Sequence, residues 1–308
     1  MSEDIKLFVE LPEVLGFSHG TLCLRYLIEA LEKNNIKVIK IIRSNSLKNK
    51  IKQNLYISSN RSIISLFREN SRIGDCFLAF DTTSPYLLDI ARKNKLRIIW
   101  WQLAPYNFLG NKQIPKTGEY SLPFSSFTDP FAEDYFYFQA RVDEQWENAL
   151  REMRERGNKK YHKICIYNGK GRLCNLSKDI KNLFPKYDIE IITRLRPKIR
   201  SEYFKVLSQC DGLISFDHIT QTNLEAASLG LPVYIANTLF PKKCLEKFNI
   251  NELKYRMTTS TKEFLEKVKS DKNIFIPFEK KYLENFNSTT IKNFIEIINC
   301  TKKVNPLK

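Results

Sequence analysis

Two acidic side chains follow one apolar run in the second half of the sequence. Asp217 comes directly after the apolar run of residues 212–216, and Glu225 follows it after seven intervening residues. A glycine and a second apolar run, residues 231–235, come next. This order predicts a strand, a turn with one acid, a short helix with the other acid, and a return strand. Such a unit puts both acids at the carboxyl edge of a sheet, where open α/β folds bind ligands.

Glu225 also has a purely structural interpretation. Thr222 precedes it by three residues, which is the spacing of a capping box, where the two side chains satisfy the first N–H groups of a helix. Gly230 is then expected to end the helix, and Pro232 to prevent it from continuing. On this interpretation Glu225 stabilises the helix and binds no ligand.

The full order of an acid, seven residues, Glu-Ala and then Gly-x-Pro-Val resembles the donor site of GT-B glycosyltransferases. The resemblance is to the large retaining family that uses nucleotide sugars, whose members usually carry two glutamates at this spacing. It implies that Glu225 accepts hydrogen bonds from the ribose of the nucleotide. It also implies that Asp217, one methylene shorter than the usual glutamate, and His218 lie near the transferred sugar. Thr222 and Asn223 are expected to join the nucleotide-sugar site.

A glycine-rich basic loop follows the strand predicted at residues 163–167. The loop contains Gly169, Lys170, Gly171 and Arg172. Glycine lets the backbone approach an anion, and cations neutralise phosphate. In the resembling family this position grips the donor diphosphate, which assigns Gly169, Lys170 and Arg172 to nucleotide-sugar binding. Arg194, after the next predicted strand, could reach the base or a phosphate. The alternative is a turn with solvated cations.

The amino-terminal region begins with a predicted βαβ unit. Its parts are a strand at residues 6–11, a helix that Thr21 can cap, and a parallel strand at residues 36–42. In GT-B proteins the glycine-bearing loop after the first strand lies over the donor phosphates, so the resemblance assigns Gly16 to the nucleotide-sugar site. His19 in the same loop is a candidate catalytic residue toward donor or acceptor, or an ordinary loop histidine. The loop lacks a complete phosphate-loop or dinucleotide fingerprint.

Strands and helices alternate along the rest of the chain. Further strands are predicted at residues 75–80, 96–101 and 188–193. Helices are predicted at residues 63–70, 140–156, 201–211, 241–249, 261–270 and 290–300, and another is expected to begin at Pro85. This rhythm is typical of doubly wound parallel sheets. We therefore predict an α/β protein with two Rossmann-like doubly wound domains facing a cleft, the GT-B architecture. The domains are residues 1–157, on the acceptor side, and residues 158–285, with the carboxyl-terminal residues 286–308 completing the first.

Residues 106–137 show no periodicity and are dense in aromatic side chains. Such density argues against disorder. The segment either covers the acceptor, because aromatic faces stack on sugar rings, or closes the core of the first domain.

The net charge of +16 limits the choice of partners. It fits nucleic acid, an anionic membrane surface or phosphate-bearing small molecules. The sequence contains no recognised nucleic-acid module, so no nucleic-acid partner is expected. We favour a phosphate-binding cleft with peripheral attraction to an anionic membrane, and a lysine-rich, well-solvated surface is the structural alternative.

The remaining composition predicts a cytoplasmic protein. The polar start of the chain is unlike a signal peptide, and no apolar run approaches the roughly 20 residues of a membrane span. The seven cysteines show no metal-ligand spacing, and no Asp-x-Asp triplet occurs. We expect neither a metal nor a resident cofactor.

The sequence thus favours a glycosyltransferase of the hexosyltransferase type. It would move a sugar from a nucleotide-diphosphate donor to a hydroxyl of a glycan or glycolipid acceptor, with retention of configuration. Two other classes stay open. One is a nucleotide-sugar epimerase or hydrolase on the same fold, in which Asp217 acts as a base. The other is a GT-B-like protein that binds polyanions without catalysis.

Overall fold

The chain divides into two compact units. Unit 1 comprises residues 1–15, 24–137 and 289–308, and unit 2 comprises residues 16–23 and 138–288. The structure is a computed structural model, and it describes residues 5–12, 19–43, 67–103, 114–126, 128–129, 131–132, 134–138, 142–169, 182–193, 196–217, 219–236, 256–270 and 277–300.

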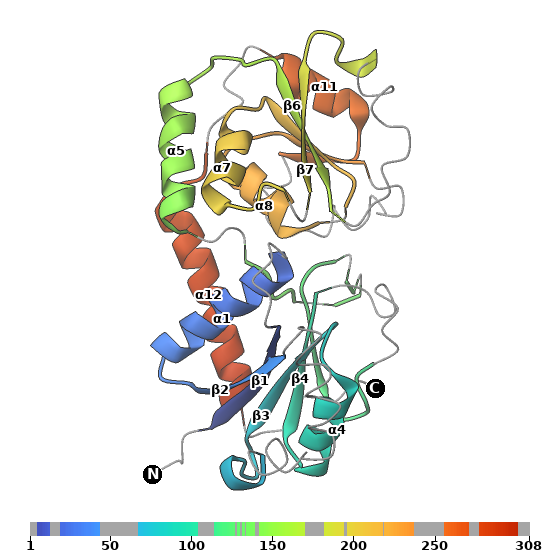
Figure 1. The fold of residues 1–308 in the computed structure, drawn as a ribbon, viewed down its shortest axis with the longest axis vertical. Coiled ribbons are helices and arrows are strands. Elements are labelled where there is room, and N and C mark those ends of the chain that lie inside the picture. Colours follow the sequence, from blue (N-terminus) through green and yellow to red (C-terminus); the bar gives the residue numbers. More distant parts are fainter. Residues whose placement is uncertain are drawn as a thin grey trace. The chain divides into compact units, whose positions relative to one another are not determined.

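Unit 1 contains a five-stranded parallel sheet with the order β2-β1-β3-β4-β5. Its strands are β1 (Lys6–Pro12), β2 (Lys37–Arg43), β3 (Cys76–Phe80), β4 (Arg97–Gln102) and β5 (Tyr120–Pro123). The helices α1 (His19–Lys33) and α4 (Pro85–Lys93) lie on opposite faces of this sheet (Figure 1). Every residue of β3 is buried, as expected for a strand covered on both sides.

Several aromatic side chains that follow β4 are buried in the core of unit 1. Phe124 and Phe136 are buried, and the ring of Trp101 lies 6.3 Å from that of Phe124. Phe294 of α12 (Lys280–Asn299) packs edge-on against Trp101 at 5.4 Å and against Phe136 at 5.3 Å. Phe131, by contrast, has 88% of its surface exposed and does not belong to this core. For the buried rings the core interpretation is therefore the right one.

Unit 2 contains a second five-stranded parallel sheet, with the order β10-β9-β8-β6-β7. Its strands are β6 (Lys163–Asn168), β7 (Asp188–Thr193), β8 (Gly212–Ser215), β9 (Val233–Ile235) and β10 (Met257–Thr258). Its helices are α5 (Glu144–Arg156), α7 (Arg200–Ser208), α8 (Gln221–Ser228) and α11 (Thr261–Lys269). The first three lie on one face of the sheet and α11 on the other (Figure 1).

Both sheets follow one topology. If the described strands are numbered from 1 within each unit, both have the order 2-1-3-4-5. The direction of strand addition reverses between the first and third strands, which are β6 and β8 in unit 2. Doubly wound sheets bind ligands at the carboxyl ends of these two strands. The topology thus indicates where in unit 2 a ligand is to be expected.

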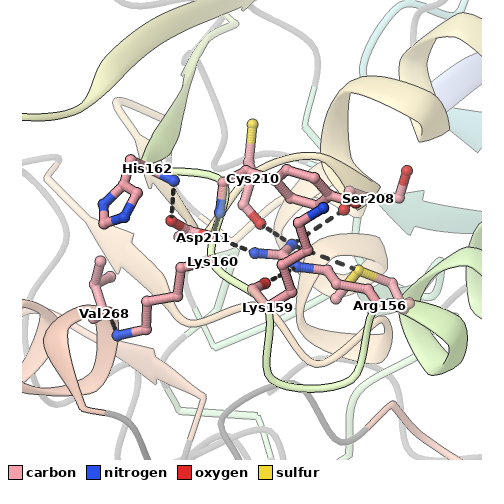
Figure 2. A network of polar contacts seen from close by, with 10 residues as sticks. Arg156, Lys159, Lys160, His162, Ser208, Cys210, Asp211 and Val268 are labelled. Carbon is pink, nitrogen blue, oxygen red and sulfur yellow. Dashed lines mark hydrogen bonds and ion pairs between the residues drawn. The ribbon is translucent and has the colours of Figure 1, made fainter.

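A buried ion pair fixes the end of α5 in unit 2 (Figure 2). The Arg156 guanidinium pairs with the Asp211 carboxylate, and both side chains are at most 1% exposed. Asp211 also accepts the backbone N–H groups of Tyr161 at 3.1 Å and His162 at 2.8 Å, at the entry to β6. Burial lowers the pKa of Arg156, although the charge of Asp211 acts against this change. Helix α5 thus groups with the second sheet, whereas the domain boundary was predicted from the sequence at the end of this helix, at residue 157.

Several element bounds differ from the prediction. Helix α1 begins at His19 rather than after Thr21, and α5 begins at Glu144 because Asp143 caps it. Helix α12 starts at Lys280, ten residues before the predicted start, in a stretch whose polar composition hides the helical period. The short strands β5 and β10 were not predicted. The helix predicted at residues 241–249 lies outside the described residues.

No helix within the described ranges is long and apolar enough to cross a membrane.

Candidate functional site

The carboxyl ends of β6 and β8 bring two of the predicted site residues together. The strands are neighbours, with Tyr167 opposite Ser215, so the residues that follow them meet at one edge of the sheet. A Cβ atom on Gly169 would lie 2.3 Å from Oδ2 of Asp217 and 2.7 Å from the hydroxyl oxygen of Tyr167. The backbone of Gly169 thus lies directly against the Asp217 carboxylate, and only glycine leaves room for it.

Asp217 is buried at this edge, with 3% of its surface exposed. Its backbone N–H donates to the hydroxyl of Ser215 at 3.3 Å. The side-chain oxygen of Asn168, the last residue of β6, is buried and accepts no hydrogen bond from the described residues. The edge therefore presents a carboxylate and an open amide oxygen, which are acceptors for hydroxyl donors.

Helix α8 begins two residues earlier than a capping box requires. Thr220 is the N-cap, with the extended backbone of that position, and its hydroxyl donates to Oδ1 of Asn223 at 3.1 Å. Thr222 is the second residue of the helix, so it cannot cap the helix together with Glu225. The capping-box interpretation of Glu225 is therefore wrong.

The predicted end of α8 is confirmed. Gly230 has a φ of 93°, which favours glycine. Its N–H donates to the carbonyl of Ala227 at 3.0 Å, and that of Leu231 donates to the carbonyl of Ala226 at 3.1 Å. These two bonds form a Schellman motif, and Pro232 follows it.

Glu225 is a buried carboxylate with two different oxygens. The side chain is 1% exposed. Its Oε1 accepts a hydrogen bond at 2.8 Å from Nη2 of Arg200, the first residue of α7. Its Oε2 is buried and meets no donor at hydrogen-bonding distance within the described part of the chain, although the hydroxyl of Tyr203 lies near the Glu225 carboxylate. A buried acceptor without a partner costs free energy, so it marks a place that a donor group of a ligand could fill.

Arg200 joins two carboxylates. Its Nε donates to Oδ2 of Asp143 at 2.8 Å, and its guanidinium lies 4.6 Å from the ring centre of Phe204. Burial alone lowers the pKa of Arg200, but the charges of Glu225 and Asp143 outweigh burial and raise it. Burial raises the pKa of Tyr203 well above its ordinary value, and the nearby Glu225 charge adds to this rise. The Arg200 guanidinium thus stays charged between the two carboxylates.

The remaining predicted site residues are either buried inside helix α8 or lie where the structure does not describe their side chains. Thr222 and Asn223 are fully buried in α8. His19 begins α1, and its side chain is not described. Five predicted site residues lie outside the described residues: Gly16, Lys170, Arg172, Arg194 and His218. Within the described ranges, no group of three or more His, Cys, Asp or Glu side chains could hold a metal ion.

Sequence reasoning missed Arg200 and Asp143. They lie 25 and 82 residues before Glu225, and no local pattern links them to it. It also missed Glu10 near the carboxyl end of β1, a buried acid whose Oε2 accepts the N–H of Ser84 at 2.6 Å, at the start of α4. Glu10 could have been noticed in the sequence, because it is an acid within an otherwise apolar predicted strand.

No family model matches the sequence, and no curated protein matches it. Solved structures do match. The co-structure of S. aureus MnaA with UDP aligns with a TM-score of 0.51 at 12% identity, over 99% of this chain and 100% of that one. The UDP-GlcNAc 2-epimerase from Methanocaldococcus jannaschii aligns with a TM-score of 0.50 at 13% identity, over 96% and 99%. The catalytic domain of starch synthase IV from Arabidopsis thaliana, bound to ADP and acarbose, gives 0.49 at 8% identity, over 96% and 98%.

The first two matches, together with the two sheets of identical strand order, establish the fold class. The chain has the two-domain α/β fold of GT-B proteins, as the sequence predicted.

Proposed function

We propose that unit 2 binds a nucleotide sugar at the carboxyl edge of β6 and β8, and that the chain transfers the sugar to a hydroxyl of a glycan or glycolipid acceptor. The observation that carries this proposal is the Glu225 carboxylate, which is buried and has one oxygen fixed by Arg200 and the other open. It stands at the position where the resembling transferases bind the ribose of the donor.

The roles of the residues follow from their chemistry. Glu225 accepts a ribose hydroxyl, and Gly169, which has no side chain of its own, allows the diphosphate to approach the backbone on the side away from Asp217 and Tyr167. Asp217 lies beside Gly169 and faces the transferred sugar. Lys170, Arg172 and Arg194 neutralise the departing diphosphate in the place of a metal ion. His218 and His19 act on the donor sugar or the acceptor, and Gly16, Thr222 and Asn223 complete the donor site.

A nucleotide-sugar epimerase is the second candidate. It is favoured by the structural match to the UDP-GlcNAc 2-epimerase from Methanocaldococcus jannaschii. In that case Asp217 acts as the base toward the sugar. This match and the UDP complex of MnaA make uridine the first base to test.

The first experiment is a thermal-shift screen with UDP, GDP, ADP, CMP and dTDP. A ligand at about 100 times its dissociation constant stabilises the folded protein by about 2.7 kcal/mol, which is easily measured. We expect one nucleotide, UDP first, to stabilise the wild type and to have little effect on Glu225→Gln. If no nucleotide stabilises the wild type, or if Glu225→Gln responds fully, the donor site is not where we propose it.

A turnover assay then separates the two enzymes. An epimerase converts UDP-GlcNAc without any acceptor, whereas a transferase releases UDP only when an acceptor hydroxyl is present. Conversion without acceptor, abolished by Asp217→Asn, would decide for the epimerase.

A further inference from the structure

Arg200 holds one oxygen of Glu225 and leaves the other open. We propose that Arg200 is a positioning residue of the donor site, which fixes Oε1 of Glu225 so that Oε2 is the preferred acceptor of one of the two ribose hydroxyls. This inference rests on the proposed function and adds to it a positioning residue and a specificity.

Three contacts fix the Arg200 guanidinium. It donates to Glu225 and to Asp143, each at 2.8 Å, and lies over the Phe204 ring at 4.6 Å. Asp143 is itself held in place as the N-cap of α5, where its Oδ1 accepts the N–H of Trp146 at 3.0 Å. A planar guanidinium held on two edges and one face cannot turn freely. The Glu225 carboxylate is therefore fixed by a group that is itself immobile.

Glu119 in unit 1 shows how a carboxylate with a structural role is bonded in this protein. Its Oε1 accepts from Nε of Arg92 at 2.7 Å. Its Oε2 accepts from Nη2 of Arg92 at 3.0 Å, from the indole of Trp100 at 2.7 Å and from the N–H of Lys116 at 2.9 Å. Both oxygens of Glu119 are thus satisfied, whereas Glu225 keeps one buried oxygen without a hydrogen bond. This difference argues that Glu225 does more than anchor Arg200.

The charge of the cluster defines the missing partner. Two carboxylates share one guanidinium, so the cluster has an excess of negative charge and would repel a phosphate. The open Oε2 needs a hydrogen-bond donor without negative charge, such as a sugar hydroxyl. Because Oε1 already accepts a hydrogen bond from Arg200 and Oε2 accepts none, we infer that Glu225 binds one ribose hydroxyl more strongly than the other.

The test is a calorimetric titration with UDP, 2′-deoxy-UDP and 3′-deoxy-UDP. In the wild type, removal of one of the two hydroxyls should weaken binding about tenfold or more, and removal of the other should matter little. Arg200→Gln should weaken UDP binding about tenfold and lose the preference. Arg200→Lys keeps a cationic donor for Oε1, so it should recover part of the UDP affinity and part of the preference for one hydroxyl.

Two further variants distinguish positioning from general stability. The residual UDP binding of Glu225→Gln, measured at high ligand concentration, should not weaken further when Arg200→Gln is added, because Arg200 acts only through Glu225. Arg92→Gln breaks the comparable ion pair with Glu119 and should lower the melting temperature while leaving UDP affinity unchanged.

The outcomes separate this inference from the proposed function. If Arg200→Gln binds UDP with wild-type affinity and preference while Glu225→Gln does not, the role of Arg200 is overturned and the donor site stands. If the wild type binds none of the screened nucleotides, both are overturned; if it binds one other than UDP, the titration uses that nucleotide and its deoxy analogues. If Arg200→Gln does not fold, Arg200→Lys is compared in the wild-type and Glu225→Gln backgrounds. If Arg200→Lys weakens UDP binding only in the wild-type background, Arg200 acts through Glu225, as proposed. If it weakens UDP binding equally in both backgrounds, or in neither, the proposal is overturned.

Discussion

Gly169 lies where any side chain would meet the polar groups at the sheet edge. A Cβ atom would overlap Oδ2 of Asp217 and the Tyr167 hydroxyl oxygen. We therefore expect Gly169→Ala to displace Asp217, to lower the free energy of unfolding by about 1–3 kcal/mol and to weaken UDP binding. Urea unfolding and calorimetry measure the two effects.

Gly118→Ala is the matched control for this change. The Cβ atom would meet nothing within 4 Å, but the φ of 89° makes any side chain costly by about 1 kcal/mol. It should lose stability without losing UDP affinity. Wild-type affinity in Gly169→Ala would show that the ligand does not approach this glycine.

Glu119 should make the stability of unit 1 depend on pH in the acid range. Burial alone raises its pKa, but the hydrogen bonds from Arg92, Lys116 and Trp100 outweigh burial and hold the pKa below its ordinary value of 4.5. A pKa lowered by folding gives stability that is present above the ordinary value and is lost as the pH falls through the folded-state pKa.

The wild type should consequently lose more stability than Glu119→Gln between about pH 5 and about pH 3. Urea midpoints at several pH values in this range measure it. Parallel pH profiles for the two proteins would contradict the assignment of Glu119.

At the level of single residues, Asp217, Glu225 and Gly169 could be named as candidates from the sequence, but the ion pair of Glu225 with Arg200 could not. The acid spacing is a local pattern and could be read directly. The pairing of Arg200 with Glu225 and Asp143 depends on how α5, α7 and α8 pack, and no local pattern contains that information. The capping box failed for a related reason, because Thr220 rather than Thr222 has the N-cap backbone.

Among the elements, α5 depends most on one buried contact. Asp211 pairs with Arg156 and accepts two N–H groups before β6. Asp211→Ala leaves the Arg156 charge buried without its partner, so the free energy of unfolding should fall by about 3–5 kcal/mol. Thermal or urea unfolding measures this loss.

Asp188→Ala provides the control within the same sheet. Asp188 begins β7 and its side chain is exposed, so its removal should change stability by at most about 0.5 kcal/mol. Equal effects of the two substitutions would mean that the buried pair does not hold α5 in place.

Elements with strong local signals were predictable. Strand β7 has the predicted bounds, residues 188–193, and Pro85 begins α4 as expected. Strands β5 and β10 have four and two residues, and they exist because a neighbouring strand offers hydrogen bonds, which the sequence does not display. The first half of α12 is polar and carries too few apolar residues to show a period.

For the whole molecule, the rhythm of strands and helices was enough to predict two doubly wound sheets, because each buried strand is a continuous apolar run. The net charge of +16 is also a property of the whole molecule. If it serves peripheral attraction to an anionic membrane, the protein should cosediment with anionic liposomes at low salt and dissociate at high salt. Neutral liposomes are the control, and equal sedimentation with both would contradict the electrostatic explanation.

The central claim is that a nucleotide binds at the carboxyl edge of β6 and β8 with its ribose on Glu225. Hydrogen–deuterium exchange of the full chain with and without UDP tests it most directly. We expect UDP to slow exchange after β6, after β8 and along α8, and Glu225→Gln to abolish this protection. Protection confined to other segments, or unchanged in Glu225→Gln, would contradict the claim.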